Sequence, residues 1–236
     1  MANKIMTVDQ FVDKLNLALA CKTLYVKGCF GAPMNAKNKQ RYTTNLTYNK
    51  NRAWIINSAT DDTYGFDCVN LVKGILWGWN ANKNANYGGS AYGTNNVPDI
   101  NADSMITKCE GVTSDFSNIV KGEFVWMQGH CGIYIGNGEV IECTPRWSNN
   151  VQVSNCGNVG NKSGHYRMWT KHGKLPWIDY SAVSVTKPVN EKSYTVVKGD
   201  TLIKIGKKTG VKWQDIATKN GIKFPYIIRV GQKLKL

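Results

Sequence analysis

The stretch at residues 67–79 constrains the fold more than any other part of the chain, because it is apolar on nearly every side. Asp67 has the side chain of a helix N-cap, and Cys68 would stand in the first turn of the helix that follows. A helix that is apolar all round belongs in the interior of a domain. Its apolar positions are Val69, Leu71, Val72, Ile75, Leu76 and Trp79. The sequence therefore predicts a buried central helix that other elements cover.

Four short segments after this helix are rich in β-branched and aromatic residues and are separated by turn signals, which is typical of strands. They span residues 123–127, 131–135, 139–144 and 151–153. Near the start of the chain, Thr7 and Gln10 form a capping-box pattern, and the apolar residues that follow share one helical face. Residues 22–60 show no clear period and are interpreted as irregular connection. Helices early and strands late predict an α+β fold, with the central helix packed on an antiparallel sheet.

Composition excludes several classes of protein. The 236 residues are 42% hydrophobic and 19% charged, so neither a disordered chain nor a fibrous repeat fits. The net charge of +14 favours a polyanionic partner such as nucleic acid, anionic lipid or wall teichoic acid, or simply a well-solvated surface. Residues 191–236 hold eleven basic and three acidic residues, so more than half of the excess lies in the last fifth of the chain. No nucleic-acid-binding motif accompanies this charge.

A linker composition marks the boundary between two domains. Residues 181–192 are small and polar and include a proline, which favours extended backbone. We predict a large domain at residues 1–180, the linker at 181–192 and a small domain at 193–236. The N-terminal residues carry charges and have no continuous apolar core, so they do not resemble a signal peptide. We therefore expect synthesis in a host cytoplasm without a signal peptide, and no insertion into a membrane.

The seven cysteines are an odd number without a C-x-x-C pair, which argues against a disulfide framework and against a structural zinc site. A catalytic thiol needs a lowered pKa, which the N-terminus of a helix supplies, and a base within reach. Cys68 is the only cysteine with that predicted setting, although packing alone also explains a cysteine there. Of the three histidines, His130 opens a predicted strand. His165 and His172 lie in a Gly- and Lys-containing stretch and are interpreted as exposed polar residues.

Glu142 is the nearest group that could orient the imidazole of His130. An Asn-Gly hairpin signal at residues 137–138 folds the next strand back alongside the histidine. An even two-residue turn would pair Ile133 with Glu142, which places Glu142 on the opposite face of the sheet from His130. The catalytic arrangement therefore requires an odd loop length or a bulge around residues 136–138.

Three sequence motifs stand around these residues: G-F-D-C-V-N-L-V, G-H-C-G-I-Y-I-G-N-G and V-I-E-C-T-P. Together they resemble the NlpC family of papain-like peptidoglycan peptidases over residues 54–145. In that family a cysteine heads a central helix, a histidine begins a strand, and a polar residue on the next strand orients the histidine. By position, the resemblance implies Cys68 as nucleophile, His130 as base and Glu142 as orienting residue. It also implies that the backbone N–H of Cys68 stabilises the oxyanion.

The chain departs from the family pattern in three places. Many members carry an aromatic hydroxyl some way before the cysteine, where this chain has Trp54 and, closer to the cysteine, Tyr64, a candidate for lining the site. The residue after the histidine is usually aliphatic and here is Cys131, which we expect to point into the core. The third position holds Glu142 in place of the frequent histidine, which adds a full negative charge.

Residues 194–236 are interpreted as strand, helix, helix and strand, with Asp200 or Thr201 capping the first helix and an Asn-Gly pair ending the second. The motifs Y-T-V, G-D-T-L and I-x-V-G-Q-K-L resemble a LysM module. Such modules bind N-acetylglucosamine-containing glycans in a shallow groove between two loops. The resemblance places in this groove Gly199, Asp200, Thr201, Ile222, Lys223, Phe224, Pro225 and Tyr226. We expect the core of the module to include Leu202, Ile205, Ile216 and Leu234.

These resemblances predict a peptidoglycan hydrolase that cleaves an amide bond of the peptide stem by a Cys-His-Glu thiol mechanism and is held on the wall by its LysM module. The bond is left open between the D-glutamyl to diamino-acid link and the muramoyl to L-alanine amide; cleavage of the latter would make the protein an N-acetylmuramoyl-L-alanine amidase. The alternatives from other classes are a non-catalytic cell-wall-binding protein and a basic nucleic-acid binder. A zinc hydrolase is a further alternative, but nothing resembles H-E-x-x-H, so neither a metal nor a cofactor is expected.

The expected partners are bacterial peptidoglycan and, through the basic C-terminal segment, anionic wall polymers. One catalytic domain, one wall-binding module and no signal peptide resemble a bacteriophage endolysin that lyses its host cell. A host autolysin exported by another route has the same features.

Overall fold

The computed structural model describes residues 3–85, 89–182, 193–222 and 226–236. The chain divides into two compact units, Met1–Lys187 and Pro188–Leu236, and the division falls within the predicted linker at residues 181–192. Each unit has its own hydrophobic core. Within the described ranges, no helix is long and apolar enough to cross a membrane.

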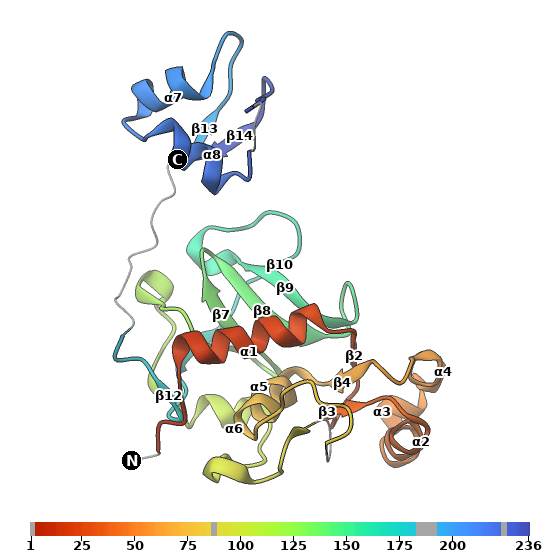
Figure 1. The fold of residues 1–236 in the computed structure, drawn as a ribbon. Helices are drawn as coiled ribbons and strands as arrows, with labels where there is room; N and C mark the ends of the chain where they lie inside the picture. Colours follow the sequence, from red (N-terminus) through yellow and green to blue (C-terminus); the bar gives the residue numbers. More distant parts are fainter. Residues whose placement is uncertain (1–2, 86–88, 183–192, 223–225) are drawn as a thin grey trace. The chain divides into compact units, whose positions relative to one another are not determined.

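A seven-stranded sheet dominates the larger unit, with the strand order β10-β9-β8-β7-β6-β11-β5 (Figure 1). Neighbouring strands pair antiparallel except β9 and β10, which are parallel. The four predicted strands are confirmed as β6 to β9, and the α+β class is confirmed with them. The strands are β5 (Glu110–Thr113), β6 (Phe124–Met127), β7 (His130–Gly136), β8 (Glu139–Thr144), β9 (Asn150–Cys156), β10 (Tyr166–Arg167) and β11 (Lys171–Lys174).

The first helix, α1 (Val8–Ala20), begins as the sequence predicts. The hydroxyl of Thr7 accepts from the backbone N–H of Gln10, and the side chain of Gln10 accepts from the backbone N–H of Thr7, so the capping box is complete. The apolar face of α1 is buried in the core that it shares with α5 and the sheet. A two-residue parallel pairing of β1 (Met6–Thr7) with β12 (Ile178–Asp179) joins the start of the larger unit to its end.

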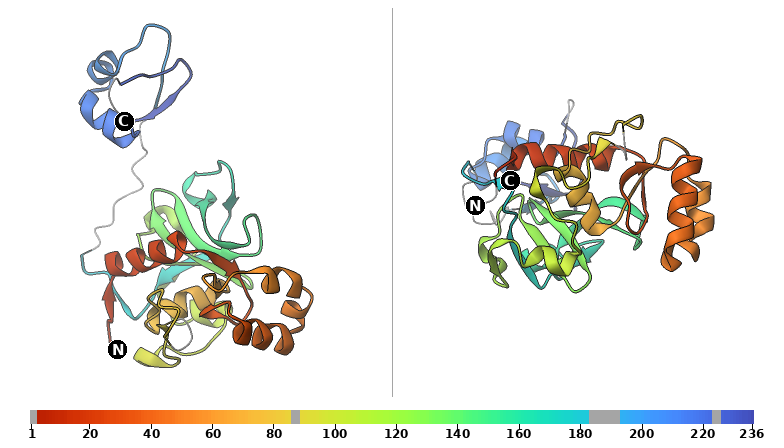
Figure 2. Two further views of the ribbon diagram at one scale, coloured as in Figure 1. Left: turned by 45° about the vertical axis from the view of Figure 1, so that its right-hand side comes forward. Right: turned by 90° about the horizontal axis from the view of Figure 1, so that it is seen from below.

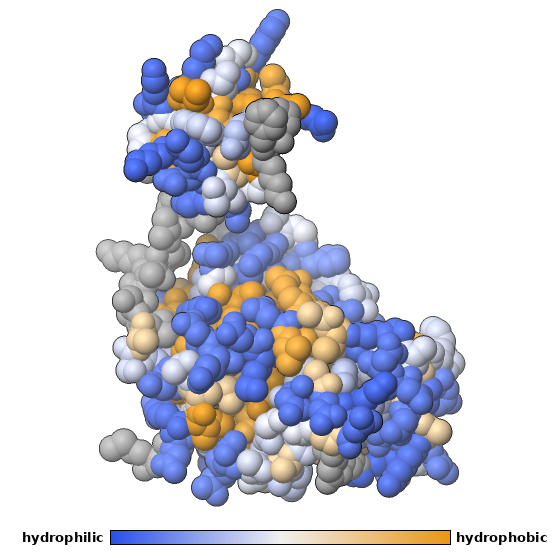
Figure 3. Space-filling model, in the orientation of Figure 1, coloured by the Kyte–Doolittle hydropathy of each residue, from blue (hydrophilic) through white to orange (hydrophobic). Residues whose placement is uncertain are grey.

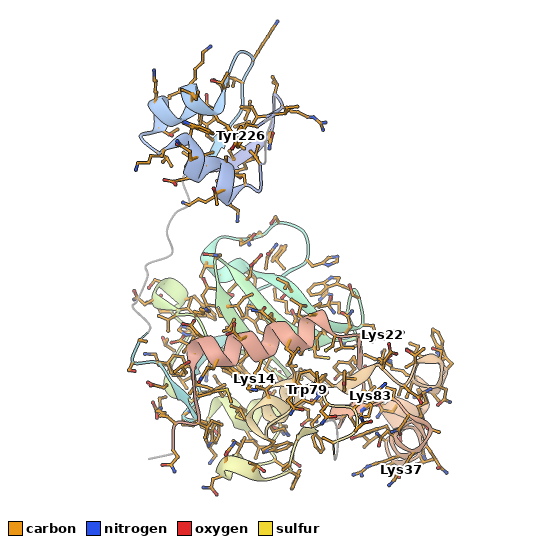
Figure 4. The ribbon with its side chains drawn as sticks, in the orientation of Figure 1. Lys14, Lys22, Lys37, Trp79, Lys83 and Tyr226 are labelled. Carbon is orange, nitrogen blue, oxygen red and sulfur yellow. The ribbon has the colours of Figure 1, made fainter. Side chains whose placement is uncertain are left out.

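The predicted central helix is α5 (Cys68–Leu76), and every one of its residues is buried. It packs against β7 and β8 on one side and α1 on another, which explains why it is apolar on nearly every side (Figure 2). The helix ends at Leu76, before the predicted end, because Gly78 has a φ of +98° and turns the chain. Trp79 nevertheless stays buried, and its Nε1 donates to the carbonyl of Gly31 at 3.1 Å (Figure 4).

The prediction of irregular connection at residues 22–60 is wrong, because this stretch forms a small subdomain beside the central helix. Its strands belong to a three-stranded sheet of order β2-β4-β3, and its helices gather at one side of the larger unit, where Figure 3 shows a mainly hydrophilic surface. The elements are too short to reveal a period, and isolated apolar residues from each of them form a separate core. They are β2 (Thr23–Tyr25), β3 (Phe30–Pro33), β4 (Tyr64–Phe66), α2 (Ala36–Asn45), α3 (Thr47–Lys50) and α4 (Ala53–Ser58), and α6 (Ala102–Ile106) follows later in the chain.

The smaller unit has the predicted order of strand, helix, helix and strand. Its elements are β13 (Ser193–Thr195), α7 (Leu202–Thr209), α8 (Trp213–Lys219) and β14 (Lys233–Lys235), and the two strands pair antiparallel. Thr201, not Asp200, caps α7, because its hydroxyl accepts from the N–H of Lys204 at 3.2 Å. The four predicted core residues are confirmed as buried.

Candidate functional site

The nucleophile position lies at the N-terminus of α5. Asp67 is the N-cap: its Oδ1 accepts from the N–H of Asn70 at 2.8 Å, and its Oδ2 accepts from the N–H of Gly28 at 2.7 Å. Cys68 is therefore the first helical residue, and its side chain is near the free N–H groups and the positive end of the helix dipole. Cys68 is only 8% exposed. Burial raises the pKa of Asp67 to about 7, and the charge of Cys68 contributes to the same shift.

The bulge on which the orienting role of Glu142 depends is confirmed. Ile133 pairs with Ile141 and Tyr134 with Val140, but Gly136 pairs with Glu139, so the register shifts between Tyr134 and Gly136. The extra residue on β7 moves the register by one place, which returns Glu142 to the face of the sheet that carries His130. His130 Nε2 and Glu142 Oε2 are 2.6 Å apart.

Gly132 makes room for this diagonal pair of side chains. A Cβ atom at position 132 would lie 2.5 Å from Cγ1 of Val140 and 3.2 Å from Cβ of Glu142. No side chain therefore fits between His130 and Glu142 on the shared face. Gly132 belongs to the G-H-C-G motif, but no local sequence signal predicts this role for it.

Cys68 is coupled to both Cys131 and His130. Hydrogen bonding with the thiol of Cys131 lowers the pKa of Cys68 well below its usual value; burial opposes this shift, and hydrogen bonding with His130 and its positive charge reinforce it. Because Glu142 holds Nε2 of the imidazole, Nδ1 is the nitrogen left for Cys68. Burial lowers the pKa of His130, but its hydrogen bonds with Cys68 and Glu142 outweigh burial and raise it overall.

Cys131 is fully buried, which confirms that it points into the core, and it is also coupled to Cys68. Burial and the hydrogen bond with Cys68 raise the pKa of Cys131 well above its usual value, so it stays a neutral thiol donor. An aliphatic residue at this position could not donate to a thiolate. Cys131, in place of the aliphatic residue of the NlpC pattern, therefore gives Cys68 a hydrogen-bond donor.

Glu142 is completely buried, and three side chains bind its carboxylate. His130 and the hydroxyl of Ser154 contact its carboxylate, and Nε of Arg167 lies 2.9 Å from Oε1 and 2.8 Å from Oε2. Burial would raise the pKa of Glu142, but the hydrogen bond with His130 and the positive charges of His130 and Arg167 lower it overall. Glu142 is therefore a carboxylate at neutral pH. Arg167 and Ser154 were not foreseen from the sequence.

The tyrosine that is coupled electrostatically to Cys68 is Tyr25, whereas the hydroxyl of Tyr64 is engaged elsewhere. The hydroxyl of Tyr64 donates to the carbonyl of Ala81, and its ring packs against Trp79 at 5.3 Å, so it is committed to the core. Burial raises the pKa of Tyr25, and the negative charges of Cys68 and Asp67 raise it further. Tyr25 ends β2, in the stretch where the sequence shows no period. Trp54 is 75% exposed.

His172 corrects the sequence-based interpretation of the other two histidines. It is buried, its Nδ1 pairs with the carboxylate of Glu123, and its Nε2 contacts the carbonyl oxygen of Asp115 at 2.9 Å. Polar neighbours in the sequence suggested exposure, but β11 lies inside the sheet between β5 and β6. His165 is exposed as expected, and its ring stacks on that of Trp147 at 4.8 Å.

A cavity of about 650 Å³ opens beside the first two turns of α5. Its wall combines the cations Arg41 and Lys73 with the carboxylate of Asp99 and the ring of Tyr92. Lys73 is almost fully buried and pairs with Asp99, whose other oxygen accepts from the hydroxyl of Tyr92 at 3.1 Å. Among the described residues, no cluster of three His, Cys, Asp or Glu side chains could hold a metal ion.

The predicted glycan-binding residues of the smaller unit are described only in part. Gly199 has a φ of +87°, and Oδ2 of Asp200 accepts from the N–H of Val197 at 2.9 Å, so this loop closes on itself. Tyr226 is 42% exposed and packs edge-on against Trp213 at 5.2 Å (Figure 4). Ile222 is partly buried against the core. The other predicted residues, Lys223, Phe224 and Pro225, lie outside the described residues.

Comparison with known proteins identifies the smaller unit. Residues 194–236 match the family model of the LysM domain. The uncharacterized lipoprotein YgeR of Escherichia coli (strain K12) is 56% identical over 43 residues, which is 18% of this chain and 17% of that protein. The lipoprotein NlpD/LppB homolog of Pseudomonas aeruginosa is 35% identical over 72 residues, 30% of this chain and 23% of that protein. The murein hydrolase activator NlpD of Escherichia coli (strain K12) is 38% identical over 66 residues, 28% of this chain and 15% of that protein.

The chain thus spans less than a quarter of the length of each of these relatives. A crystal structure of a MoCVNH3 variant in complex with (N-GlcNAc)4 aligns with 44% of this chain and 57% of that chain at 23% identity. Its TM-score of 0.19 is too low to inform the fold.

These relatives correct the predicted location. The sequence predicts synthesis in a host cytoplasm without a signal peptide, and that prediction is wrong: two of the relatives are bacterial lipoproteins by name, which points to the bacterial cell envelope. The prediction relied on charges among the first residues, which do not report the compartment in which a folded domain acts. The resemblance to a bacteriophage endolysin depended on the same expectation and loses its basis with it.

Proposed function

We propose that this protein is a peptidoglycan hydrolase that cleaves an amide bond of the peptide stem through Cys68. The observation that carries the proposal is the arrangement of three residues: Cys68 at the start of α5, His130, whose pKa is raised by hydrogen bonding with Cys68, and the buried carboxylate of Glu142, 2.6 Å from Nε2 of His130. The order of α5, β7 and β8 supports a papain-like domain of the NlpC type. The LysM domain supports binding of the protein to peptidoglycan, and its basic residues suit anionic wall polymers as well.

The geometry suits acyl transfer to a thiol. The thiolate of Cys68 attacks the amide carbonyl, and the backbone N–H of Cys68 at the helix N-terminus stabilises the oxyanion that forms. The imidazolium of His130 then gives its proton to the leaving amine, while Glu142 holds the ring through Nε2. A water molecule that His130 deprotonates hydrolyses the thioester and regenerates the thiol.

The cavity beside α5 supports a peptide substrate. A peptide stem carries carboxylates, amide groups and, in its diamino acid, an amine. The wall of the cavity carries charges of both signs, Arg41 and the paired side chains of Lys73 and Asp99, beside the first two turns of α5. This chemistry favours cleavage within the stem. Cleavage of the muramoyl to L-alanine amide by the same thiol is the alternative bond.

A second candidate function comes from the relatives. The Escherichia coli and Shigella flexneri proteins that align with 66 residues of this chain at 38% identity are named murein hydrolase activators, so a role in wall binding or hydrolase activation without catalysis is the alternative from another class. Only the catalytic proposal explains why a helix N-terminus, an imidazole and a fully bonded carboxylate converge on one thiol.

Mass spectrometry of the fragments released from purified cell walls separates these functions. We expect the wild-type protein to release stem fragments with a new free amine, and Cys68→Ala to release none while it still sediments with the walls. Cys21→Ala is the matched control, because Cys21 is a free, partly exposed thiol at the end of α1. Iodoacetamide should abolish release and EDTA should not.

Intact stems freed from the sugar would identify the amidase reaction instead. Binding to walls without any release, or equal release by Cys68→Ala, would contradict the catalytic proposal and favour the binding or activating role.

A further inference from the structure

Glu142 brings a negative charge to a position that is neutral in the family pattern, and it does so at zero exposure. A buried carboxylate needs compensation, since burial without a partner strongly disfavours the charged form. His130 alone cannot provide it in every step, because its charge changes during the proposed reaction. A permanent cation is therefore required near Glu142.

Arg167 on β10 is that cation. Its Nε contacts both carboxylate oxygens of Glu142, at 2.9 and 2.8 Å, and its Nη2 donates to the hydroxyl of Thr144 at 3.0 Å. Its side chain is 10% exposed, so the pair is screened little by solvent. An arginine does not lose its proton in a protein, so this charge stays constant while His130 titrates.

Two tryptophans hold the guanidinium in place. Arg167 lies over the ring of Trp147 at 4.7 Å and near that of Trp169 at 6.0 Å. Trp169 in turn stacks on the imidazole of His130, with ring centroids 5.7 Å apart and an interplanar angle of 17°. The ring of His165 stacks on Trp147. One of the two tryptophans that fix Arg167, Trp169, thus also contacts the proposed base.

We propose that Arg167 is a positioning residue of the Cys68–His130–Glu142 site, which keeps Glu142 ionised and lets it orient His130 without overstabilising the imidazolium. The functional meaning of this inference rests on the proposed thiol mechanism. The physical claim, a charge coupling between Arg167 and His130 through Glu142, stands by itself and is tested separately.

The pKa of His130 depends on every charged group near its imidazole. Cys68 and Asp67 face it from α5, and Glu142 faces it from β8 with Arg167 behind it on β10. The thiols of Cys131 on β7 and Cys143 on β8 are buried and neutral, because burial raises the pKa of each. Arg167 is the only permanent cation in this set. Its removal leaves the site one charge more negative, which favours the protonated form of His130.

NMR titration of the histidine side chains tests the coupling without any need for activity. The chain has only three histidines, and the signal of His130 is identified by its loss in His130→Asn. We expect Arg167→Met to raise the pKa of His130 by about one pH unit, as a unit charge several ångströms away does at intermediate dielectric. Arg167→Lys should retain most of the wild-type value. Arg146→Met is the matched control, because Arg146 also lies over Trp147, at 5.3 Å, and should change nothing.

Kinetics then test the functional meaning. Arg167→Met should lower kcat/KM roughly 10- to 100-fold, mainly through kcat, and move its whole pH profile to higher pH. In a Glu142→Gln background, Arg167→Met should lower kcat/KM by less than about twofold, because the carboxylate through which Arg167 acts is gone.

An unchanged titration of His130 in folded Arg167→Met, or in Arg167→Gln if the first variant does not fold, would overturn the coupling. A uniform loss of activity with no pH shift would reduce Arg167 to a structural role. If the protein cleaves no wall at all, the titration still decides the coupling, so the two failures are distinguishable.

Discussion

Two histidine–glutamate pairs lie in the same seven-stranded sheet, and they differ in what the second ring nitrogen meets. His130 and His172 are both held by a buried glutamate, Glu142 and Glu123 respectively. The second nitrogen of His172 contacts a backbone carbonyl at 2.9 Å, whereas that of His130 is left for Cys68. Both ring nitrogens of His172 meet oxygen acceptors, whereas one ring nitrogen of His130 is left for a thiol.

This difference teaches that a carboxylate–imidazole pair is not by itself a catalytic feature. Acceptors on both nitrogens require a doubly protonated ring, so His172 is an imidazolium that ties β11 to β6 and to the turn at Asp115. At His130 the third partner is a thiol at a helix N-terminus, which can exchange the proton. The third partner therefore distinguishes the structural pair at His172 from the pair at His130 that we propose to be reactive.

Replacing each histidine with alanine should give the largest difference in activity between the two pairs. We expect His130→Ala to lower the rate of wall hydrolysis by at least about 1,000-fold, because both the proton transfer and the activation of the thiol are lost. His172→Ala should change the rate of the remaining folded protein by less than about twofold. Fragment release from purified walls, normalised to folded protein by circular dichroism, measures both. Equal losses of activity in the two variants would contradict the proposed difference between the two pairs.

Removing the charge of the orienting carboxylate has a smaller effect. Glu142→Gln keeps the shape and one acceptor oxygen but no longer stabilises the imidazolium, so we expect kcat to fall roughly 100-fold with little change in KM. The matched variant, Glu123→Gln, should leave kcat unaltered. A Glu142→Gln enzyme with wild-type kcat would show that His130 needs no orienting charge.

The pair at His172 should appear in stability and its dependence on pH. Burial lowers the pKa of His172, but its bonds with Glu123 and Asp115 outweigh burial and raise it above 6.5. The stabilisation is therefore complete below about pH 6.5 and is lost as pH rises through the folded pKa. His172→Gln should cost about 3 kcal/mol at pH 6 and less at pH 9 in urea unfolding of the larger unit. A cost that is independent of pH would contradict a charged His172.

Local patterns allowed the elements around the site to be predicted. The cap at Asp67, the all-apolar helix and the alternating strands are encoded within a few neighbouring residues, and two glycines near the hairpin permitted the bulge that Glu142 requires. The LysM domain was predictable for the same reason, since its motifs are contiguous.

Contacts between distant segments could not be predicted in this way. Arg167 reaches Glu142 from a two-residue strand, Tyr25 comes from a stretch without a period, and the burial of His172 follows from its strand position inside the sheet. None of these has a signal in its own neighbourhood. The negative charge of Glu142 was a usable hint, because a buried carboxylate implies a cation that must come from elsewhere in the chain.

The pH dependence of thiol alkylation tests the central claim most directly. Peptide mapping by mass spectrometry follows each of the seven cysteines during reaction with iodoacetamide. We predict that Cys68 reacts first and at a pH well below the ordinary thiol pKa of about 8.5, and that His130→Ala but not His172→Ala moves this dependence to higher pH. If Cys68 reacts with the pH dependence of Cys21 in the wild-type protein, it is not an activated nucleophile and the proposed mechanism is wrong.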